Sequence, residues 1–587
     1  MNIWTYVLIP GAILAITVIA AAISAASKHR DKVMSPINIM FVGVFLASFL
    51  VFCPVYANEF RGDIRGVFDI KTFLVSVHNA IKLFVVDSDY QSVIDAIGKN
   101  RGIAAAAYSV LCAILFVLAP LLTFGFILSF FKNLTAYRRY LFSFSKDAYI
   151  FSELNSKSMA LARDIKENHK SAVIVFTDVS QDRESDIYEL AEQAQELGAI
   201  CFSRDILSVR FDIHSKAKKL IFLTVDDEND SLKLSLGLIR KYGLRQKTEL
   251  FAFSTCIESE LLLNAANKNL NMKVRRINPV RSLTYDIIDK SGENIFRSAR
   301  DCENGKKLIS AIVVGMGEYG FEMTKALTWL CQMPGYELKL NVFDSDEAAE
   351  RRFLMNCPEL VRGDDSTHPE NRYDITIHPG IEINTAEFMQ ELEKIGAVTY
   401  AFVSLGDDTQ NIETAVRLRS VLLNAGYSPM IQAVVYDSEK KELLCGVGNF
   451  ENPPKPYNID FVGDLRSIYS GEAVLSTELE RFALGRHMRY GSEESFWAYE
   501  YNYRSSMASA IHIEMCKRLA IPGADKAPSE RTPEELDVLR HTEHSRWNAY
   551  MRSEGYRRGP KNHMAKTHAM LVPFDELPLS EQEKDDA

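Results

Sequence analysis

The sequence predicts a membrane-anchored α/β protein, and three observations lead to this class. Three long apolar stretches near the N-terminus contain no charged residue. Beyond them, segments typical of strands and helices alternate, and this alternation occurs twice. The two alternating halves also match each other in detail. We therefore expect transmembrane helices followed by two parallel sheets covered by helices, with a smaller, mainly helical part at the C-terminus.

The three apolar stretches are long enough to cross a bilayer, which takes about 20 residues in an α-helix. The first resembles a secretion signal, but its basic residues follow the apolar run instead of preceding it, so we interpret it as a retained helix. The predicted spans are about 5–27, 36–58 and 103–131. We assign residues 1–145 to a transmembrane domain.

The basic residues near these spans predict the orientation of the chain. They cluster between the first two spans and after the third, and such clusters stay on the cytoplasmic side. These residues are Lys28, His29, Arg30, Lys32, Lys132, Arg138, Arg139 and Lys146. We therefore expect a multi-pass protein of the cell membrane with its N-terminus outside. The segment 59–102 should also lie outside, and 132–587 should be cytoplasmic.

Composition excludes several classes of partner. The net charge is −10 and 25% of residues are charged, which argues against a nucleic acid polymer as partner. The nine cysteines form no CxxC pair and show no spacing typical of a zinc site or a disulfide framework. We expect no metal, and we interpret the cysteines as packing residues.

The cytoplasmic part shows two successive α/β patterns. Each contains short runs rich in β-branched and aromatic residues, separated by helical runs, and this order is typical of parallel sheets. The predicted strands of the first half are 148–152, 172–178, 218–225 and 249–255. Those of the second half are 309–315, 338–344, 375–379, 399–405 and 430–437.

The two halves align as copies of one unit. Asp226 and Asp227 fall on Asp407 and Asp408, and the pair Arg281-Ser282 falls on Arg466-Ser467. An internal duplication of a Rossmann-type unit explains this match. The region resembles the TrkA-N or RCK family, the regulatory nucleotide-binding domains found beneath potassium channels and transporters. The predicted domains are 146–305, a degenerate copy, and 306–475, a nucleotide-binding copy.

The second copy contains the motif GMGEYG between a predicted strand and a predicted helix. In a dinucleotide fold the first glycine permits the tight turn, the second lets the backbone approach phosphate, and the third lets helix and strand pack closely. Gly315, Gly317 and Gly320 fit these roles. Asp344 ends the next strand, 24 residues after Gly320, where an acid can accept from ribose hydroxyls.

We therefore predict that the second copy binds an adenine nucleotide such as NAD, ADP, ATP or an ADP-ribose-like ligand. The acidic turn of the second copy, at Asp407, Asp408 and Asn411, belongs to the resemblance to the TrkA-N or RCK family. The candidate cofactor-binding residues are Gly315, Gly317, Glu318, Tyr319, Gly320, Asp344, Asp407, Asp408 and Asn411.

The first copy lacks the glycines. Ser152, Leu154 and Lys157 stand opposite them in the sequence SELNSKS, so side chains occupy the space that phosphate needs. Asp178 persists at the end of the second strand. We interpret this copy as a structural unit that pairs with its twin.

Helical patterns replace strands beyond about residue 475. We expect a helical connector over 476–530, and Ser529 or Thr532 is the candidate cap of the next helix. The following segment, 531–587, resembles the ryanodine-receptor repeat, or RyR domain. Its EHxxW motif is Glu543, His544 and Trp547, and its second motif is Gly555, Tyr556, Gly559 and Pro560. The tail KTHAMLVPFDELP completes the match. Together with the tandem RCK-like units, this pattern is similar to that of a bacterial membrane protein.

The RyR-like segment mixes aromatic faces with cations, a combination that suits a nucleotide. Trp547 and Tyr556 can sandwich a purine while the cations meet phosphate; the alternative is that Trp547 belongs to the core of the segment. The four histidines of the region have no cysteine or carboxylate companion that would indicate a metal site. The candidate ligand-binding residues are Glu543, His544, Arg546, Trp547, Tyr556, Arg557, Lys566 and His568.

These features favour a sensor or effector over an enzyme. We find no catalytic arrangement of nucleophile and base, and the only filter-like sequence, at Thr123, is followed by no further transmembrane helix. We expect nucleotide-type ligands to control the transmembrane helices of a homo-oligomer, a dimer or tetramer, which can form an ion-conducting pore or a signalling effector. The alternatives are a regulatory subunit of potassium transport and an NAD-dependent oxidoreductase.

Overall fold

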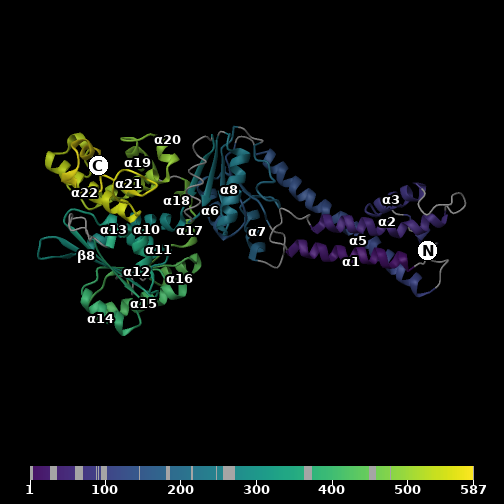
Figure 1. Ribbon diagram of the computed structural model, residues 1–587, viewed down its shortest axis with the longest axis horizontal. Coiled ribbons are helices and arrows are strands. Elements are labelled where there is room, and N and C mark those ends of the chain that lie inside the picture. Colours follow the sequence, from purple (N-terminus) through teal and green to yellow (C-terminus); the bar gives the residue numbers. More distant parts are fainter. Residues whose placement is uncertain are drawn as a thin grey trace. The chain divides into compact units, whose positions relative to one another are not determined.

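The computed structural model divides into two compact units, Met1–Tyr140 and Leu141–Ala587, which are described separately (Figure 1). It describes residues 4–26, 36–59, 70–87, 89, 91–93, 95, 102–143, 146–179, 186–212, 216–245, 247–255, 271–361, 373–448, 458–475 and 478–585.

The first unit is a helical bundle. Helix α2 packs against both α1 and α3. The core of the bundle includes Phe52 and Tyr56 of α2 and Tyr108 of α5. The hydroxyl of Tyr108 donates a 2.5 Å hydrogen bond to the carbonyl oxygen of Val51. The helices are α1 Thr5–Ala26, α2 Pro36–Glu59, α3 Ile70–Leu83 and α5 Ile103–Leu141.

Two described helices of this unit are long and apolar enough to cross a membrane. They contain the stretches Ile39–Ala57 in α2 and Ile103–Phe124 in α5, and they correspond to the second and third predicted spans. The apolar stretch of α1, Val7–Ala22, is shorter. The basic residues at 28–32 and most of 88–101 lie outside the described residues.

The second unit contains two sheets with the same strand order. The first sheet is entirely parallel with the order β3-β2-β1-β4-β5-β6, which is the order of the doubly wound dinucleotide-binding fold. Its strands are β1 Ala148–Phe151, β2 Val173–Phe176, β3 Ile200–Cys201, β4 Lys219–Leu223, β5 Thr248–Phe253 and β6 Lys273–Ile277. Its helices are α6 Ser156–Asn168, α7 Asp186–Glu196 and α8 Glu228–Tyr242.

The second sheet repeats this order as β10-β9-β8-β11-β12-β13, and β7 adds an antiparallel partner to β8. Its strands are β7 Arg300–Asp301, β8 Lys307–Val314, β9 Tyr336–Asp344, β10 Asp374–Pro379, β11 Tyr400–Val403, β12 Met430–Val434 and β13 Ile459–Val462. Its helices are α10 Pro279–Arg297, α11 Glu318–Leu330, α12 Ala349–Asn356, α13 Pro358–Val361, α14 Ala386–Ile395, α15 Asp408–Asn424 and α16 Ser438–Gly448.

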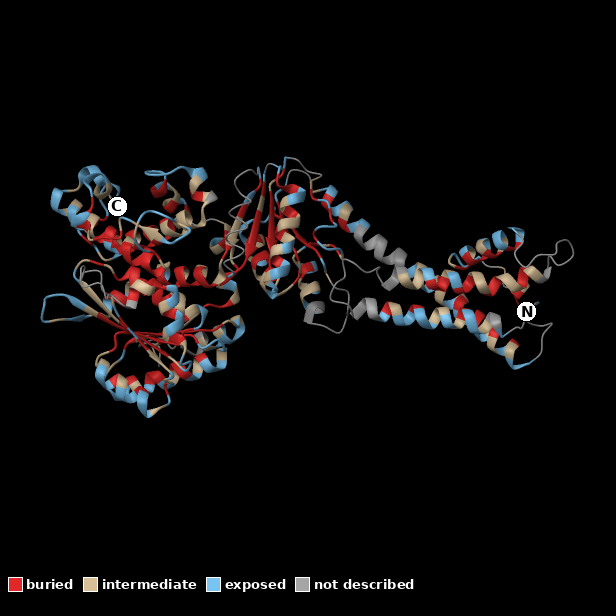
Figure 2. Ribbon diagram, in the orientation of Figure 1, coloured by how far each residue is buried: buried red, intermediate tan, exposed pale blue. Residues whose placement is uncertain are grey.

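The predicted tandem of parallel α/β sheets is confirmed. Strands β1, β4 and β11 are buried along their whole length, as expected where helices cover both faces of a sheet (Figure 2). The sequence did not predict β3, β6, β7 or β13. Strand β6, with the sequence KVRRI, carries three basic residues, so its hydrophobic pattern is weak.

The C-terminal part is mainly helical, as predicted. The long helices α21 and α22 dominate it, and α22 begins after Thr532, which caps it together with Glu535. The alternative cap, Ser529, lies in a short 3-10 helix. The elements are α17 Leu465–Ile468, α18 Gly471–Leu475, α19 Glu478–His487, α20 Glu493–Ala498, α21 Glu500–Arg518, η3 Pro528–Glu530, α22 Pro533–Ser553, β14 Arg557–Arg558, β15 Thr567–His568, η4 Phe574–Glu576, α23 Leu579–Gln582 and η5 Glu583–Asp585.

One continuous hydrophobic core joins the C-terminal helices to both sheets. Helix α22 packs against α11, α13 and α21. Trp329 of α11 is fully buried, and its ring meets those of Tyr285 in α10 and Tyr550 in α22 edge to face at 5.8 and 6.4 Å. The RyR-like segment therefore shares its core with α11, the helix that follows the GMGEYG motif.

Candidate functional site

The glycine turn links β8 to α11, and each glycine has a distinct structural reason. Gly315 has a φ of +90°, and a Cβ there would lie 2.1 Å from the carbonyl oxygen of Ser404. A Cβ at Gly320 would lie 1.8 Å from the carbonyl oxygen of Gly315. Gly317 has no neighbour within 4 Å of its Cβ position and is the N-cap of α11, with no side chain capping it. The open position is therefore the one where a phosphate would approach the helix.

Asp344 stands beside this turn at the end of β9. Its carboxylate accepts hydrogen bonds from the backbone N–H of Met316 at 2.5 Å and that of Asp346 at 2.7 Å. These bonds tie the turn to β9. Each carboxylate oxygen can accept a further hydrogen bond, so ribose binding is compatible with this anchoring role.

The acidic turn at the start of α15 makes contacts with backbone. Asp407 caps the helix by accepting from the N–H of Gln410 at 3.0 Å. Asp408 accepts from the N–H of Tyr436 at 2.8 Å and that of Asp437 at 3.0 Å. The contacts of Asp408 tie the start of α15 to the carboxyl end of β12, at the same edge of the sheet as the glycine turn.

Asn411 is fully buried and connects two strand ends. Its side-chain oxygen accepts from the N–H of Leu405 at 2.5 Å, while its amide group donates to the carbonyl oxygen of Val434 at 2.9 Å. Asn411 therefore holds the carboxyl ends of β11 and β12 together.

An aromatic pair lies next to the glycine turn. Tyr319, in the first turn of α11, and Tyr436, just after β12, have ring centroids 5.6 Å apart. Burial raises the pKa of Tyr319, so its phenol stays neutral at physiological pH. Glu318 is exposed and opens α11. Sequence reasoning missed Tyr436, although its place at the end of a predicted strand was a usable signal.

The corresponding turn of the first copy is closed by its own side chains. Asn155 caps α6 by accepting from the N–H of Ser158 at 2.8 Å, and the hydroxyl of Ser158 accepts from the N–H of Asn155 in return. Lys157 pairs with Asp226 at the edge of the same sheet. The helix end that would meet phosphate is thus already satisfied.

Three predicted ligand residues of the RyR-like segment are buried polar residues. Glu543 accepts from Arg546 at 2.9 and 3.0 Å and from the hydroxyl of Ser509 at 2.7 Å. Although burial opposes its charge, Arg546 and Arg486 hold the pKa of Glu543 down at about 2. His544 lies between the carbonyl oxygen of Val572, at 2.8 Å, and Asp585, at 3.2 Å. These contacts connect α22 to α21 and to the C-terminal segment that contains Val572 and Asp585.

Trp547 and His568 form an aromatic surface that is only half-buried. The Trp547 ring lies 5.0 Å from that of His568 and 5.7 Å from that of His544. Burial lowers the pKa of His568 to about 4, so its ring is neutral at physiological pH. Trp547 is half-buried, and the buried part of its indole packs on the core, as one of the two interpretations predicts.

The remaining predicted residues, Tyr556, Arg557 and Lys566, have different surroundings. Tyr556 is buried, and its hydroxyl lies 3.0 Å from Nδ1 of His563. Arg557 is exposed on β14, and the ammonium group of Lys566 donates to the carbonyl oxygen of Glu554 at 2.9 Å. Within the described part of the chain, no group of three or more His, Cys, Asp or Glu is placed to hold a metal.

A buried ionic cluster lies between the glycine-turn helix and α22. Glu554, at the C-cap of α22, accepts from Lys325 of α11 at 2.7 Å and from Arg281 of α10 at 3.2 Å. The guanidinium of Arg504, in α21, lies 3.4 Å from its second oxygen. Glu322 of α11 accepts from Arg281 at 2.7 Å and from Lys325 at 3.2 Å. We call these five residues the Glu554 cluster.

The Glu554 cluster keeps its charges despite burial. Burial raises the pKa of a carboxyl group, but Arg281, Lys325 and Arg504 outweigh it and hold the pKa of Glu554 well below its usual range. Glu322 likewise raises the pKa of Lys325 against the effect of burial. Losing one partner would leave an uncompensated buried charge, which typically costs about 3 to 5 kcal/mol.

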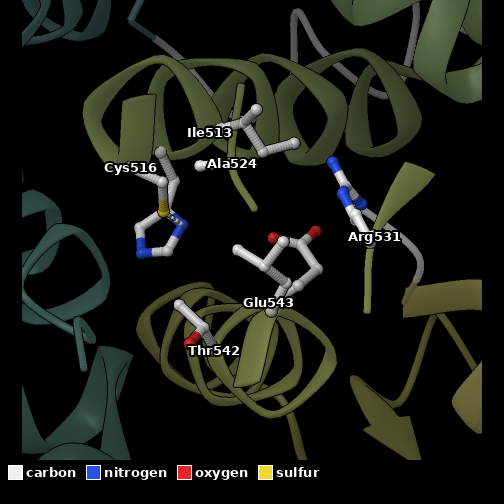
Figure 3. A pocket seen from close by; sticks show the side chains of 8 residues that line it. Ile513, Cys516, Ala524, Arg531, Thr542 and Glu543 are labelled. Atoms are coloured by element: carbon white, nitrogen blue, oxygen red, sulfur yellow. Dashed lines mark hydrogen bonds between the residues drawn. The ribbon is translucent and has the colours of Figure 1, made fainter. Parts of the chain in front are cut away.

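A small cavity between α21 and α22 contains a cysteine and a histidine (Figure 3). Its volume is about 10 Å³, room for one water molecule. Burial raises the pKa of Cys516 to about 12 and lowers that of His512 to about 4. The thiol is therefore protonated and the imidazole is a weak base, which is the opposite of an activated nucleophile.

Comparison with known proteins adds no assignment. No protein-family model matches the chain, and no curated protein is significantly similar to it.

The glycine geometry predicts opposite outcomes for two similar substitutions. Gly320→Ala should lower the free energy of unfolding by about 3 kcal/mol, because the new methyl group would overlap the backbone of Gly315. Gly317→Ala should change it by less than about 1 kcal/mol, because its Cβ position is open and its φ is −69°. Urea denaturation of the full chain in detergent, followed by tryptophan fluorescence, measures both. Equal losses would contradict the open position at Gly317.

The Glu554 cluster predicts a large cost for a small change. Glu554→Gln should destabilise the second unit by about 3 to 5 kcal/mol, because Arg281, Lys325 and Arg504 would lose the buried carboxylate that they have in common. The control is Glu576→Gln, which removes the partner of Arg558 in an exposed pair 3.8 Å apart and should cost less than about 1 kcal/mol. Thermal melting compares them. Similar melting temperatures for the two variants would show that the cluster is not a structural constraint.

Proposed function

We propose that the protein is a membrane-bound sensor or effector in which cytoplasmic nucleotide-type ligands control the transmembrane helices. The observation that supports this most directly is the open N-terminus of α11. Gly317 caps the helix without a side chain and has free space at its Cβ position, whereas the twin turn is closed by Asn155 and Ser158. A phosphate at the second turn would gain the backbone N–H groups and the helix dipole.

The proposal places an adenine nucleotide along the carboxyl edge of the second sheet. Its phosphates would lie at Gly317, and Asp344 would accept from its ribose. The rings of Tyr319 and Tyr436 offer an apolar surface for the base. Glu318, Asp344 and Asp408 place negative charge near this edge of the sheet. Because like charges repel, a mononucleotide with few phosphate charges, or a dinucleotide, fits better than a more highly charged phosphate compound.

The membrane part of the proposal rests on the apolar helices of the first unit. We propose that α1 joins α2 and α5 as the third span, with the N-terminus outside and the α/β unit in the cytoplasm. Several such chains would assemble around a common axis as a dimer or tetramer. The assembly would act as a pore or as a signalling effector, with regulation of potassium transport as the second candidate function, which the RCK-like resemblance favours.

Helix α11 offers a route by which a ligand at the glycine turn can affect α22. It begins at the glycine turn and contributes Glu322 and Lys325 to the Glu554 cluster one to two helical turns later. Because α22 ends in the same cluster, a shift of either helix changes the environment of buried charges on the other. A ligand at either end can bias this arrangement only if it binds one state more tightly.

Nucleotide binding is the direct test of the first site. Isothermal calorimetry of the full chain with ATP, ADP, NAD and ADP-ribose should show binding for at least one of them. Gly317→Val should raise its Kd at least about 100-fold, because a branched side chain would fill the phosphate space. The matched control, Ser156→Val at the exposed first residue of α6, should leave the Kd unchanged. Absence of binding in the wild type, or normal binding by Gly317→Val, would make the turn purely structural.

The C-terminal surface is tested in the Gly317→Val background. Any of these nucleotides that still binds that variant should lose its affinity when Trp547→Ala is added, because the half-exposed indole is the stacking surface. The loss of stability should be only about 1 to 2 kcal/mol, less than for a fully buried tryptophan. Trp329→Ala serves as the fully buried comparison in thermal melting. Retained binding, or failure of the Trp547→Ala variant to fold, would remove Trp547 from the binding residues.

A further inference from the structure

Helix α3 of the first unit buries several polar side chains and exposes several large aliphatic ones. Its inward face carries Thr72, Ser76 and Asn79, which are exposed by only 7%, 0% and 7%, beside the buried Ala80 and Leu83. Its outward face carries Ile70 and Leu74, which are exposed by 75% and 58%. In water, large aliphatic side chains are buried and small polar ones stay outside.

Helix α14 of the α/β unit shows the ordinary arrangement. It buries Phe388 and Leu392 and exposes Glu387 and Glu393. The same chain therefore builds one short helix for water and another with its apolar side outward. Such an outward face is stable where the surroundings are themselves apolar.

The apolar outer face of α3 continues around the unit. Exposed aliphatic side chains also lie on the other helices of this unit, including Ile16 of α1, Val42 of α2 and Leu121 of α5, which are exposed by 66%, 51% and 62%. A dimer contact would leave apolar residues on one patch, whereas lipid requires them on every helix. This distribution favours lipid over a second copy of the chain.

The length and the basic residues of α3 indicate how it can lie in a bilayer. Its 14 residues extend about 21 Å at 1.5 Å per residue, less than the roughly 30 Å of a bilayer core, so it cannot span the membrane. Lys71, His78 and Lys82 are spaced to lie along one edge of the helix, beside the apolar face. Such an edge suits the phosphate groups of lipid headgroups.

We propose that α3 is an interfacial helix, embedded in one leaflet with Ile70, Leu74 and Ile81 against lipid acyl chains and its basic edge toward the headgroups. It is an additional lipid-binding surface, separate from the spans. This inference rests on the membrane anchoring proposed above. The inner face of helix α3 packs on α2. Helix α3 would therefore be attached to the bundle on one side and contact the bilayer on the other.

Photo-crosslinking of the full chain tests the proposal. Benzoylphenylalanine replaces Leu74 in protein reconstituted into vesicles of phosphatidylethanolamine and phosphatidylglycerol, and adducts are identified by mass spectrometry. The same replacement at Val42, in the outward face of a proposed span, is the positive control. Leu244, an aliphatic residue of the α/β unit that is 76% exposed, is the negative control.

We expect lipid adducts at positions 74 and 42, with at least about tenfold less adduct at position 244. Lipid adducts at 42 but not at 74 would overturn the interfacial helix and leave the anchoring proposal intact. Adducts of position 74 with a second copy of the chain would identify an oligomer interface instead and also overturn it. Lipid adducts at neither 74 nor 42 would overturn the anchoring proposal itself.

Discussion

The carboxylate of Glu554 is the constraint on which the α/β unit depends. It lies away from water among three cations that come from α10, α11 and α21. Buried charges tolerate little displacement, because the attraction between them must offset the loss of hydration. The four helices can therefore meet in few ways. The orientation of α11, and with it the position of the glycine turn at its start, is determined partly by the end of a helix more than two hundred residues later in the chain.

Sequence reasoning succeeded where local signals agree with the final environment. The strands ISAIVV and TYAFV are mostly apolar runs, and both are buried between parallel neighbours in the second sheet. It failed at β6, because Lys273, Arg275 and Arg276 hide the pattern of a strand. In the folded protein Arg275 pairs with Glu480 and Arg276 with Glu500, two carboxylates that come from later helices. Nothing near KVRRI in the sequence indicates those partners.

The candidate site shows the same limit at the level of single side chains. The turn geometry of Gly315 and Gly320 follows from the motif, because only glycine fits such close backbone contacts. The motif cannot say where a carboxylate points, however. Asp408 and Asn411 bind backbone, and Glu543 is held by Arg546, although each belongs to a pattern that indicated a ligand. Which residues meet a ligand depends on which contacts the fold has already used.

The continuous core that joins α22 to the sheets has a consequence for how this protein can be divided. A domain boundary drawn at residue 530 from sequence motifs falls between segments that share Trp329, Tyr550 and the Glu554 cluster. A fragment ending there would expose the indole of Trp329 and leave Lys325 without one of its two carboxylates. The RyR-like segment taken alone would lose the cations around Glu554. The two parts thus share one core and one ionic cluster, and a cut between them would expose apolar surface and buried charge on both.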